Sequence, residues 1–367
     1  MKKLSIIGTV GLPPKYGGFE TFADFLVKKL SNNYNITIFC SSKHYKDREK
    51  KYFSTKRIFF PFKANGIQSI PYDILSILIS IFISDTLLIL GISGCIILPI
   101  IKPFHQKKII VSLGGLEWER DKWSRLAKWF LKLSEKCAIN FADIILTDNI
   151  AIQDYVKFKY YRKSELIEYG GDQSVNIMPT LKDIKKFSFL KNEYALSISR
   201  IEPENNCDLI LQAFSELNDI QLIYIGNWDN NKYSKTLRGK YLSHNNIILL
   251  DAIYDINVLN LVRSNCTIYV HGHSVGGTNP TLVEAMYVGL PILAFDVNFN
   301  RETTQNKALF FNDIKQLQNN VKLLLKNQTL HKNKNQTLHK NIAQNMQRFA
   351  LKRYNWERII NKYDSIL

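Results

Sequence analysis

The segment KLSIIGTVGLPPKYGGFETFADFLVKKL (Lys3–Leu30) contains the features that decide the fold. A short apolar run, Leu4–Gly8, predicts a buried strand, and Phe19–Leu30 has the spacing of an amphipathic helix. The glycine- and proline-rich loop between them matches neither Gly-x-Gly-x-x-Gly nor the P-loop pattern. Because Gly17 and Gly18 directly precede the helix, their amides lie where a helix N-terminus attracts phosphate. A plain strand-to-helix turn is the alternative interpretation.

Strands and helices alternate through the rest of the chain. In the first half we expect a helix at Asp121–Phe141 and strands at Asn35–Cys40, Thr86–Leu90, Ile109–Leu113 and Ile144–Thr147. The pattern restarts after a polar linker, 170–191, with strands at Tyr194–Ser199, Ile220–Ile225, Ile247–Leu250, Cys266–His271 and Pro291–Phe295. Helices are expected between them at Cys207–Glu216, Ile256–Ser264 and Thr281–Tyr287. The alternation predicts an α/β protein with two Rossmann-like, doubly wound domains facing across a cleft, where ligands bind at the carboxyl ends of the strands.

Length and composition agree with two domains. The chain has 367 residues, of which 46% are hydrophobic, more than a single core usually supports. We expect an N-terminal domain (1–175), a C-terminal domain (176–350) and a final helix (351–367) that packs back on the N-terminal domain. The apolar span Ile74–Ile101 is long enough to cross a membrane, but Asp85 and Pro99 interrupt it. We interpret it as a buried helix at Tyr72–Ser84 followed by a strand and a short second helix.

The cysteine content and the net charge limit which cellular compartment and which binding partners we expect. The five cysteines are scattered singly without Cys-x-x-Cys spacing, which argues against disulfides or a zinc site and fits a reducing cytoplasm. The formal net charge of +17 fits nucleic acid, an anionic membrane surface or phosphorylated ligands. A lysine-rich composition without a functional cause is the alternative.

Two further motifs place polar residues at strand ends. In SRIEPENNCDLILQAF (Ser199–Phe214), Arg200 follows a strand and is well placed to bind a diphosphate, or to form a surface salt bridge. In HGHSVGGTNPTLVEAMYVGLPILAF (His271–Phe295), a glycine-rich loop leads through Thr278, Asn279 and Pro280 into a helix. Pro280 suits the first helical turn, and Asn279 or Thr278 can cap it. One turn into that helix, the Glu284 carboxylate can accept both hydroxyls of a ribose, or can compensate the helix dipole.

These motifs resemble the GT-B glycosyltransferases of family 4, which are retaining enzymes with nucleotide-sugar donors. More narrowly, GTVGLPPKYGGFET, GGLEWERDKW and HGHSVGGTNPTLVEAM resemble the bacterial rhamnosyltransferase-like subgroup that builds polysaccharides such as capsule or O-antigen. The resemblance implies an N-terminal acceptor-binding domain and a C-terminal nucleotide-sugar-binding domain. It also implies transfer of L-rhamnose from dTDP-rhamnose to a lipid-linked saccharide, without a metal or another cofactor.

The resemblance assigns roles to particular residues. Gly17 and Gly18 would meet the distal phosphate of the donor, Arg200 would bind the diphosphate, and Glu284 would hold the ribose. The sugar and phosphate would also contact the amides of Gly277, Thr278 and Asn279. The leaving phosphate oxygen would take the proton of the acceptor, so the protein would supply charge stabilisation rather than a strong base.

Three positions depart from the family pattern. Gly276 replaces the first of two glutamates spaced eight apart, and His273 is the candidate to contact the sugar instead. Asn205 replaces a lysine near the diphosphate. Gly114 replaces an aspartate near the acceptor, where Glu117 is the candidate substitute. These departures bear on catalysis more than on the fold.

The helix after GGLEWERDKW carries a candidate membrane-binding face. Core spacing on one side involves Trp123, Leu126, Ala127, Phe130, Cys137, Ala138 and Phe141, and a second side carries Trp129 with Arg125, Lys128, Lys132 and Lys136. A basic stripe with a tryptophan suits an anionic membrane surface, and a solvated helix face is the alternative. We therefore expect a cytoplasmic protein, peripheral on the inner face of the cell membrane.

Two other functions compete with the transferase. A GT-B nucleotide-sugar epimerase would need acid and base carboxylates near the sugar, and the chain lacks one of them at Gly276. A nucleic-acid-binding protein would account for the charge, but it predicts basic residues clustered with aromatic ones, whereas the lysines are spread over the whole length. No nucleic-acid partner is therefore expected.

Overall fold

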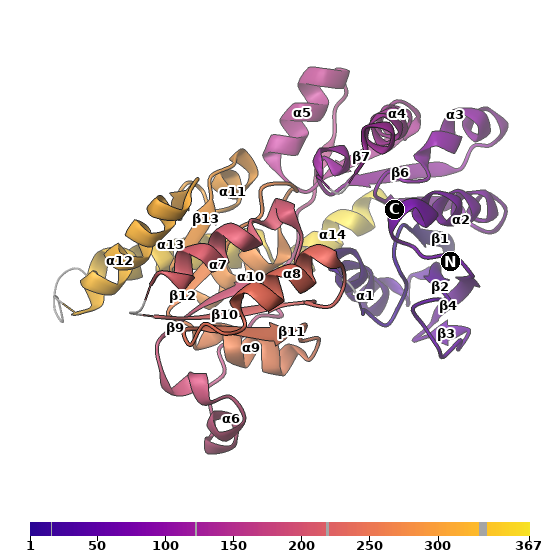
Figure 1. The fold of residues 1–367 in the computed structure, drawn as a ribbon. Coiled ribbons are helices and arrows are strands. Elements are labelled where there is room, and N and C mark those ends of the chain that lie inside the picture. Colours follow the sequence, from indigo (N-terminus) through magenta and orange to yellow (C-terminus); the bar gives the residue numbers. More distant parts are fainter. Residues whose placement is uncertain (16, 122, 218–219, 330–335) are drawn as a thin grey trace. The chain divides into compact units, whose positions relative to one another are not determined.

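The computed structural model describes residues 1–367 except 16, 122, 218–219 and 330–335. The chain forms two compact units (Figure 1). The first contains Met1–Tyr169 together with Trp356–Leu367, and the second contains Gly170–Asn355. The first boundary therefore precedes residue 175, because the stretch expected to be a linker belongs to the second unit and contains the capped helix α6 (Leu181–Lys186).

The first unit is built on an eight-stranded sheet with the order β3-β4-β2-β1-β5-β6-β7-β8. All neighbouring strands are parallel except the β3–β4 pair. The strands are β1 (Lys2–Ile7), β2 (Tyr34–Ser41), β3 (Lys51–Tyr52), β4 (Thr55–Phe60), β5 (Thr86–Leu90), β6 (Lys108–Leu113), β7 (Ile144–Thr147) and β8 (Glu165–Leu166). Without its two edge strands, the order is the 3-2-1-4-5-6 arrangement of a Rossmann fold.

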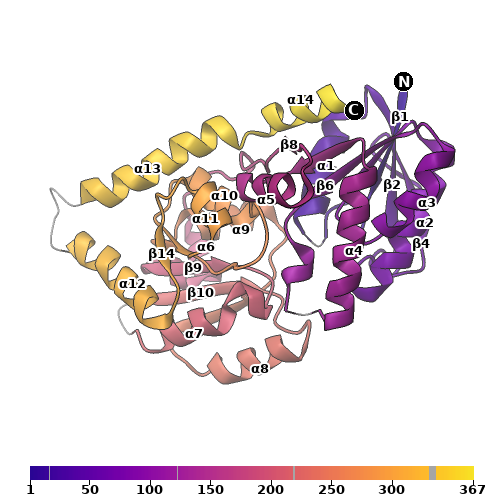
Figure 2. The same cartoon turned by 90° about the horizontal axis from the view of Figure 1, so that it is seen from above.

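Helices cover both faces of this sheet (Figure 2). They are α1 (Gly18–Leu30) and α14 (Trp356–Ile366) on one face, and α2 (Ser69–Ile83), α3 (Leu98–Ile101), α4 (Arg125–Phe141) and α5 (Ile150–Tyr160) on the other. Alternation along β5 supplies both cores, since Leu88 and Leu90 join the first cluster while Leu87 and Ile89 join the second. Burial of each such side chain contributes about 1.5–3 kcal/mol.

Short 3-10 helices connect several of these elements. They are η1 (Gly66–Gln68), η2 (Cys95–Ile97), η3 (Lys102–Phe104) and η4 (Glu117–Glu119). The interrupted apolar span therefore forms α2, the central strand β5, and η2 with α3, as expected from its interruptions. The α2 helix was expected to be buried, but its outer side is exposed, with Phe82 at 86%. By length and composition alone, the stretch Gly66–Ile83 passes for a membrane-crossing helix.

The final helix, α14, belongs to the first unit. Its Trp356 ring stacks on Phe25 of α1, with ring centroids 4.4 Å apart, and Tyr363 lies 4.7 Å from Phe22. The hydroxyl of Tyr34 donates to the Asp364 carboxylate at 2.8 Å. The α14 helix thereby completes the core on the α1 face of the sheet.

The second unit repeats the same design with a six-stranded, all-parallel sheet in the order β11-β10-β9-β12-β13-β14. Its strands are β9 (Tyr194–Ile198), β10 (Gln221–Gly226), β11 (Ile247–Asp251), β12 (Ile268–His271), β13 (Ile292–Phe295) and β14 (Leu309–Phe311). This order is again 3-2-1-4-5-6, so the expected fold class of two Rossmann-like α/β domains is confirmed.

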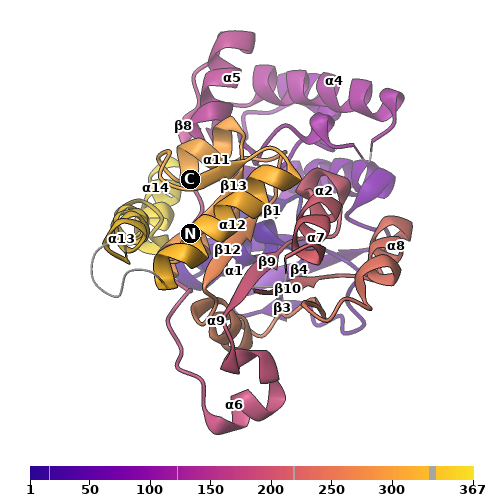
Figure 3. The same cartoon turned by 60° about the vertical axis from the view of Figure 1, so that its left-hand side comes forward.

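Two layers of helices flank the second sheet (Figure 3). The first layer contains α7 (Cys207–Ser215), α8 (Lys232–Tyr241) and α12 (Ile314–Thr329). The second contains α9 (Ile256–Ser264), α10 (Pro280–Val288) and α13 (Gln336–Arg353). The remaining helices are α11 (Asn298–Thr303), η5 (Ser188–Lys191) and η6 (Pro203–Asn205).

One predicted helix face differs from the structure. The α4 helix begins at Arg125, capped by Ser124, rather than at Asp121. Leu126 was expected in the core but is 75% exposed, whereas the charged residue Glu135 is buried. Glu135 is buried because it accepts hydrogen bonds from Trp118, Tyr155 and Tyr160, which the spacing of the helix cannot reveal.

Candidate functional site

The second unit places its polar motifs at the point where the strand order reverses. Strands β9 and β12 are neighbours there, and their carboxyl ends form the edge where doubly wound sheets bind ligands. A side chain at Gly272 would collide with the Asn205 carbonyl oxygen, so only glycine allows the two loops to approach this closely. The Asn206 amide donates to the Gly272 carbonyl at 2.8 Å and fixes the loops together.

Arg200 follows β9 at this edge and is exposed to solvent. Its carbonyl oxygen accepts a 2.7 Å hydrogen bond from the side-chain amide of Asn205, which is fully buried. Asn205 stands where the family has a lysine, but its side chain is uncharged and does not reach solvent. It holds the turn that carries Arg200, and its side-chain oxygen has no hydrogen-bond partner among the described residues.

Two histidines stack at the end of β12, and sequence reasoning identified only one of them. The rings of His271 and His273 lie 4.4 Å apart at an interplanar angle of 13°. His271 is 1% exposed, neither of its ring nitrogens has a partner among the described residues, and burial lowers its pKa to about 3. His273 is buried too, and its carbonyl accepts from the buried Asn300 at 2.9 Å. His271 thus supports the ring of His273 as a neutral imidazole.

The N-terminus of α10 lies at the same edge. Asn279 is the N-cap, since its side-chain oxygen accepts from the Thr281 amide at 3.2 Å, and Pro280 occupies the first helical turn as predicted. The Thr281 hydroxyl reaches the carbonyl of Ile198 at the end of β9. Gly277 and Thr278, which lead into the helix, are buried, whereas Gly276 has a φ of +145° and open space where a side chain would lie.

Glu284 lies one turn into α10 and is already engaged. Its carboxylate accepts from Gln173 at 2.7 Å and forms an ion pair with the fully buried Arg263 of α9. Arg263 also donates to Ser174 and Asn260, at 3.1 and 3.0 Å. Neither Gln173 nor Arg263 stood out in the sequence, because both pair with Glu284 over long separations. A carboxylate offers about four lone-pair sites, so further hydroxyls can still bind.

In the first unit, four side chains form hydrogen bonds with the backbone of the opening glycine-rich loop. Gly8 has a φ of +90°, and a side chain there would collide with the Leu90 carbonyl oxygen of β5. Buried or part-buried side chains bind the loop backbone: Glu20 accepts from Val10, Tyr72 donates to Thr9, Arg57 to Leu12 and Tyr45 to Pro13, at 2.7–3.0 Å. The loop is therefore rigid before any ligand binds.

Gly17 and Gly18 lie at the N-terminus of α1. Gly17 is the N-cap and has no side-chain cap, and its carbonyl accepts from Thr21 at 3.2 Å. Both glycines are partly exposed, as a phosphate-binding backbone requires. The Glu20 carboxylate of the same turn is buried and directed to the Val10 amide.

Gly114 and Glu117 follow β6 in the same unit. A side chain at Gly114 would lie 2.9 Å from the Phe19 ring, so Phe19 fills the space that an aspartate would need. Glu117 begins η4, and its carboxylate accepts from Arg120 at 2.6 Å and from Trp123 at 3.3 Å. Arg120 and Trp123 thus hold the carboxylate that was expected to replace the missing aspartate.

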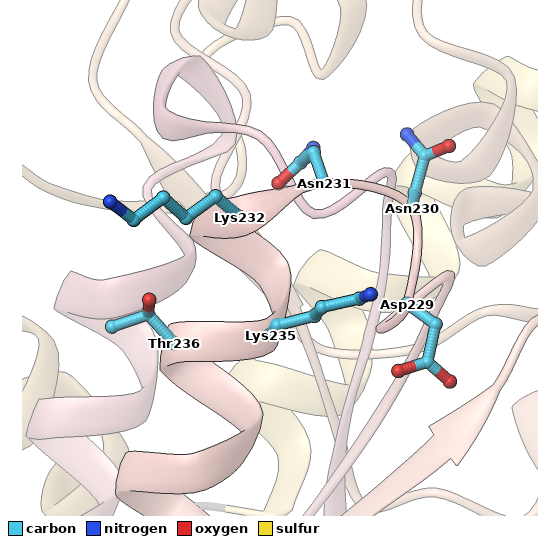
Figure 4. A pocket seen from close by; sticks show the side chains of 6 residues that line it. All are labelled: Asp229, Asn230, Asn231, Lys232, Lys235 and Thr236. Atoms are coloured by element: carbon cyan, nitrogen blue, oxygen red, sulfur yellow. The ribbon is translucent and has the colours of Figure 1, made fainter.

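The predicted residues therefore form two groups, one in each unit. Gly17, Gly18 and Glu117 lie in the first, and the second contains Arg200, His273, Gly277, Thr278, Asn279 and Glu284. A separate hollow of about 480 Å³ at the start of α8 contains none of them (Figure 4). It is lined by Asp229, Asn230, Asn231, Lys232, Lys235 and Thr236. Within the described ranges, no cluster of three or more His, Cys, Asp or Glu side chains is arranged to hold a metal ion.

Comparison with solved structures identifies the fold. The structure resembles GT-B glycosyltransferases along its whole length. Sucrose-phosphate synthase from Thermosynechococcus elongatus superposes with a TM-score of 0.78 at 13% identity, covering 100% of this chain and 98% of that one. HepE of Anabaena in complex with UDP-glucose gives a TM-score of 0.77 at 14% identity and covers 100% of both chains. At such identities the likeness establishes the fold.

Sequence comparison establishes the family. Residues 180–366 match the glycosyl transferases group 1 family, and the chain belongs to it. Residues 1–172 match a domain of unknown function, DUF1972. An uncharacterised glycosyltransferase of Methanocaldococcus jannaschii is 25% identical, covering 100% of this chain and 98% of its own. The protein CapJ of Staphylococcus aureus is 25% identical over 40% of this chain and 38% of its own.

Proposed function

We propose that this glycosyltransferase moves L-rhamnose from dTDP-rhamnose, with retention, onto a lipid-linked saccharide in cell-surface polysaccharide synthesis. The observation that carries the proposal is the edge of the second sheet, where Arg200, the His271–Asn279 loop and the N-terminus of α10 adjoin. A guanidinium and the backbone amides of a glycine-rich loop that leads into a helix suit a diphosphate. The complex of HepE with UDP-glucose shows that this fold accepts a nucleotide sugar, which supports a donor of that class here.

Each residue of the second unit has a role in this proposal. Arg200 and the amides of Gly277 and Thr278 bind the diphosphate, and His273 contacts the sugar in place of the absent carboxylate at Gly276. Glu284 accepts a hydroxyl of the nucleoside. Arg263 and Gln173 occupy part of the acceptor capacity of this carboxylate, and the remaining lone pairs can accept the single hydroxyl of a deoxyribose.

The chemistry needs charge stabilisation at the leaving group. The bond from the sugar carbon to the phosphate oxygen breaks while the acceptor oxygen attacks from the same face. The acceptor proton passes to the departing phosphate oxygen, and Arg200 with the amides of Gly277 and Thr278 stabilises the negative charge that develops. This route requires no metal. In the first unit, we assign the Gly17 and Gly18 amides to phosphate and the Glu117 carboxylate, which Arg120 and Trp123 hold, to the acceptor.

A lipid-linked acceptor would also bring the protein to a membrane. The α4 helix presents Arg125, Lys132 and Lys136 to solvent together with Trp129, which is 63% exposed. Basic residues beside an exposed tryptophan favour an anionic bilayer surface. We therefore place the protein on the cytoplasmic face of the cell membrane as a peripheral protein.

Donor binding can be tested by thermal shift with dTDP-, UDP- and GDP-sugars. A ligand that binds only the folded state raises the free energy of unfolding, by about 2.7 kcal/mol at a ligand concentration of a hundred times Kd, and so raises the melting temperature. We expect dTDP-rhamnose to stabilise the wild type and Glu284→Ala to lose the effect. Glu284→Ala also removes the counter-charge of the buried Arg263, so it can destabilise the fold. Arg200 is exposed, so Arg200→Gln gives a second test of donor binding, with Arg238→Gln as its control. Stabilisation by short oligonucleotides but by no nucleotide sugar would contradict the proposal.

A further inference from the structure

The α2 helix is oriented opposite to an ordinary surface helix. Its buried residues are mostly polar: Ser69, Tyr72, Asp73, Ser76, Ile77 and Ser80. Ser76 and Ser80 satisfy themselves by donating to backbone carbonyls one turn earlier, at 2.8 and 2.6 Å. Two of its apolar side chains face outward, since Leu75 is 37% exposed and Phe82 is 86% exposed, and others pack only partly against the core. A soluble helix normally buries its apolar stripe and exposes its polar one.

The outward side of α2 carries no charge. The helix contains no Lys, Arg or Glu, and its one acidic residue, Asp73, is buried. Ile67, just before the helix, is 77% exposed, and the separations from Ile67 to Leu75 and from Leu75 to Phe82 are each about two helical turns, so the three side chains lie on one side. Water therefore meets an uncharged apolar surface along the full length of α2.

Neighbouring elements extend this surface. Ile100 of α3 and Phe104 of η3 are 63% and 85% exposed, and α4 adds Leu126, Trp129 and Leu133. The η2–α3 segment packs against both α2 and α4, and two views show the three helices side by side (Figures 1 and 2). We call this surface the apolar face; its members are Ile67, Leu75, Phe82, Ile100, Phe104, Leu126, Trp129 and Leu133. Several exposed apolar side chains on neighbouring elements indicate an interaction site.

The exposed charged side chains of α4 are all basic. On α4, Arg125, Lys132 and Lys136 are exposed, and the single acidic residue of the helix, Glu135, is 1% exposed. Lys128, between them, lies 3.7 Å from Asp121. The solvent side of α4 is therefore apolar and basic, which is complementary to an apolar interior beneath anionic headgroups.

We propose that the apolar face docks in the surface of an anionic lipid bilayer, with α2 lying in the interface plane. The inference rests on the proposed function in that a lipid-linked acceptor brings the enzyme to such a surface. A second copy of this chain is a poorer partner, because a symmetric contact would oppose the same basic rows. The α2 helix does not cross the bilayer, since β5 follows it directly and pairs with β1 and β6 in the sheet.

Fluorescence can locate the face relative to the lipid. Phe82→Trp is made in a Trp129→Phe background and mixed with vesicles of equal parts phosphatidylglycerol and phosphatidylcholine, brominated in their acyl chains. We expect the added tryptophan to be quenched beyond the background variant. Leu242→Trp, in the same background and 62% exposed in the second unit, is the matched control and should not be quenched. Equal quenching of both reporters, or of neither, would overturn the proposal.

Vesicle flotation tests the energetics. We expect Phe82→Ser with Phe104→Ser to lower the vesicle partition coefficient by about tenfold, whereas Met178→Ser with Leu242→Ser should leave it unchanged. All four side chains are exposed, so the melting temperature should not move. Unchanged flotation of the first variant, equal binding to pure phosphatidylcholine, or a wild-type dimer that Phe82→Ser dissociates would each overturn the proposal.

The two proposals fail separately. Thermal shift with dTDP-rhamnose is measured on the same preparations in the absence of vesicles. Loss of vesicle binding with donor binding intact would overturn the docking surface and the peripheral placement, but not the proposed sugar transfer. Vesicle binding without any donor binding would overturn only the proposed function.

Discussion

The fully buried guanidinium of Arg263 forms an ion pair with the carboxylate of Glu284, the residue proposed to hold the nucleoside of the donor. Gln173 binds the second oxygen, so the carboxylate is oriented before any ligand arrives. A group fixed in this way loses little freedom on binding, which favours affinity. The same pairing makes Arg263 a positioning residue with a stability role.

Removal of Arg263 should be costly to the fold. Arg263→Met leaves Glu284 buried without its counter-charge, and we expect a loss of about 3–5 kcal/mol in the free energy of unfolding. Arg238→Met is the matched control, because Arg238 forms surface ion pairs with Asp229 and Asp251 and should cost about 0–1 kcal/mol. Urea unfolding followed by circular dichroism measures both. Similar losses in the two variants would contradict the assigned importance of the buried pair.

Asp73 should destabilise the protein at neutral pH. Burial raises its pKa well above the ordinary value, and its Oδ1 atom has no partner among the described residues. Above the unfolded pKa, unfolding releases the proton that the folded state retains, so stability falls with rising pH by about 1.4 kcal/mol per pH unit. Asp73→Asn should therefore raise the free energy of unfolding at about pH 7 and change it little at about pH 4.

Asp85 is the opposite control. The backbone amide of Lys3 lowers its pKa, so its ionised form contributes stability that is present above the unfolded pKa and is lost in acid. Asp85→Asn should lower the melting temperature at neutral pH, whereas Asp73→Asn should raise it. A decrease in both variants would show that Asp73 is ionised and stabilising in the folded protein.

His271 should make the second unit sensitive to acid. Because its folded pKa is lowered to about 3, the unfolded state binds a proton first as the pH falls below about 6.5. Stability is then lost at up to about 1.4 kcal/mol per pH unit until the folded pKa is reached. His271→Phe keeps an aromatic ring beside His273 and should reduce this acid dependence. Titration of the His271 ring near its ordinary pKa, observed by NMR, would refute the prediction.

Gly114 tests the space beneath Phe19. Gly114→Asp restores the family residue but brings its side chain within 2.9 Å of the Phe19 ring, so we expect a loss of about 1–3 kcal/mol from overpacking. Phe19→Ala with Gly114→Asp should recover part of that loss, and a double-mutant cycle measures the coupling. Additive effects of the two substitutions would mean that Phe19 does not occupy the aspartate site.

The sequence predicted the central strands and the site loops well because both depend on local signals. Thr86–Leu90 and Ile144–Thr147 were predicted with their observed bounds, and Asn279 with Pro280 marked the start of α10. Edge strands such as Lys51–Tyr52 were missed because two residues give no periodicity. The tandem Rossmann architecture follows from the strand–helix alternation alone.

Long-range pairing explains what the sequence could not reveal. Glu284 pairs with Arg263, and Glu135 is buried by three donors from two other elements, so residue spacing predicts neither environment. The α2 helix reads as a buried core helix, yet its serines face the sheet and Phe82 faces outward. The apolar content of a segment can indicate a buried helix, but it does not predict which side of that helix packs against the sheet.

The central claim is that the second unit binds the diphosphate of a nucleotide sugar through Arg200, and calorimetric titration of dTDP-rhamnose tests it most directly. A charge-assisted hydrogen bond contributes about 1.5–3 kcal/mol, so Arg200→Gln should weaken binding by about 10–150-fold. Arg238→Gln, in the same unit, should bind as the wild type does. Tight binding that is insensitive to Arg200→Gln, or no binding by the wild type, would contradict the account.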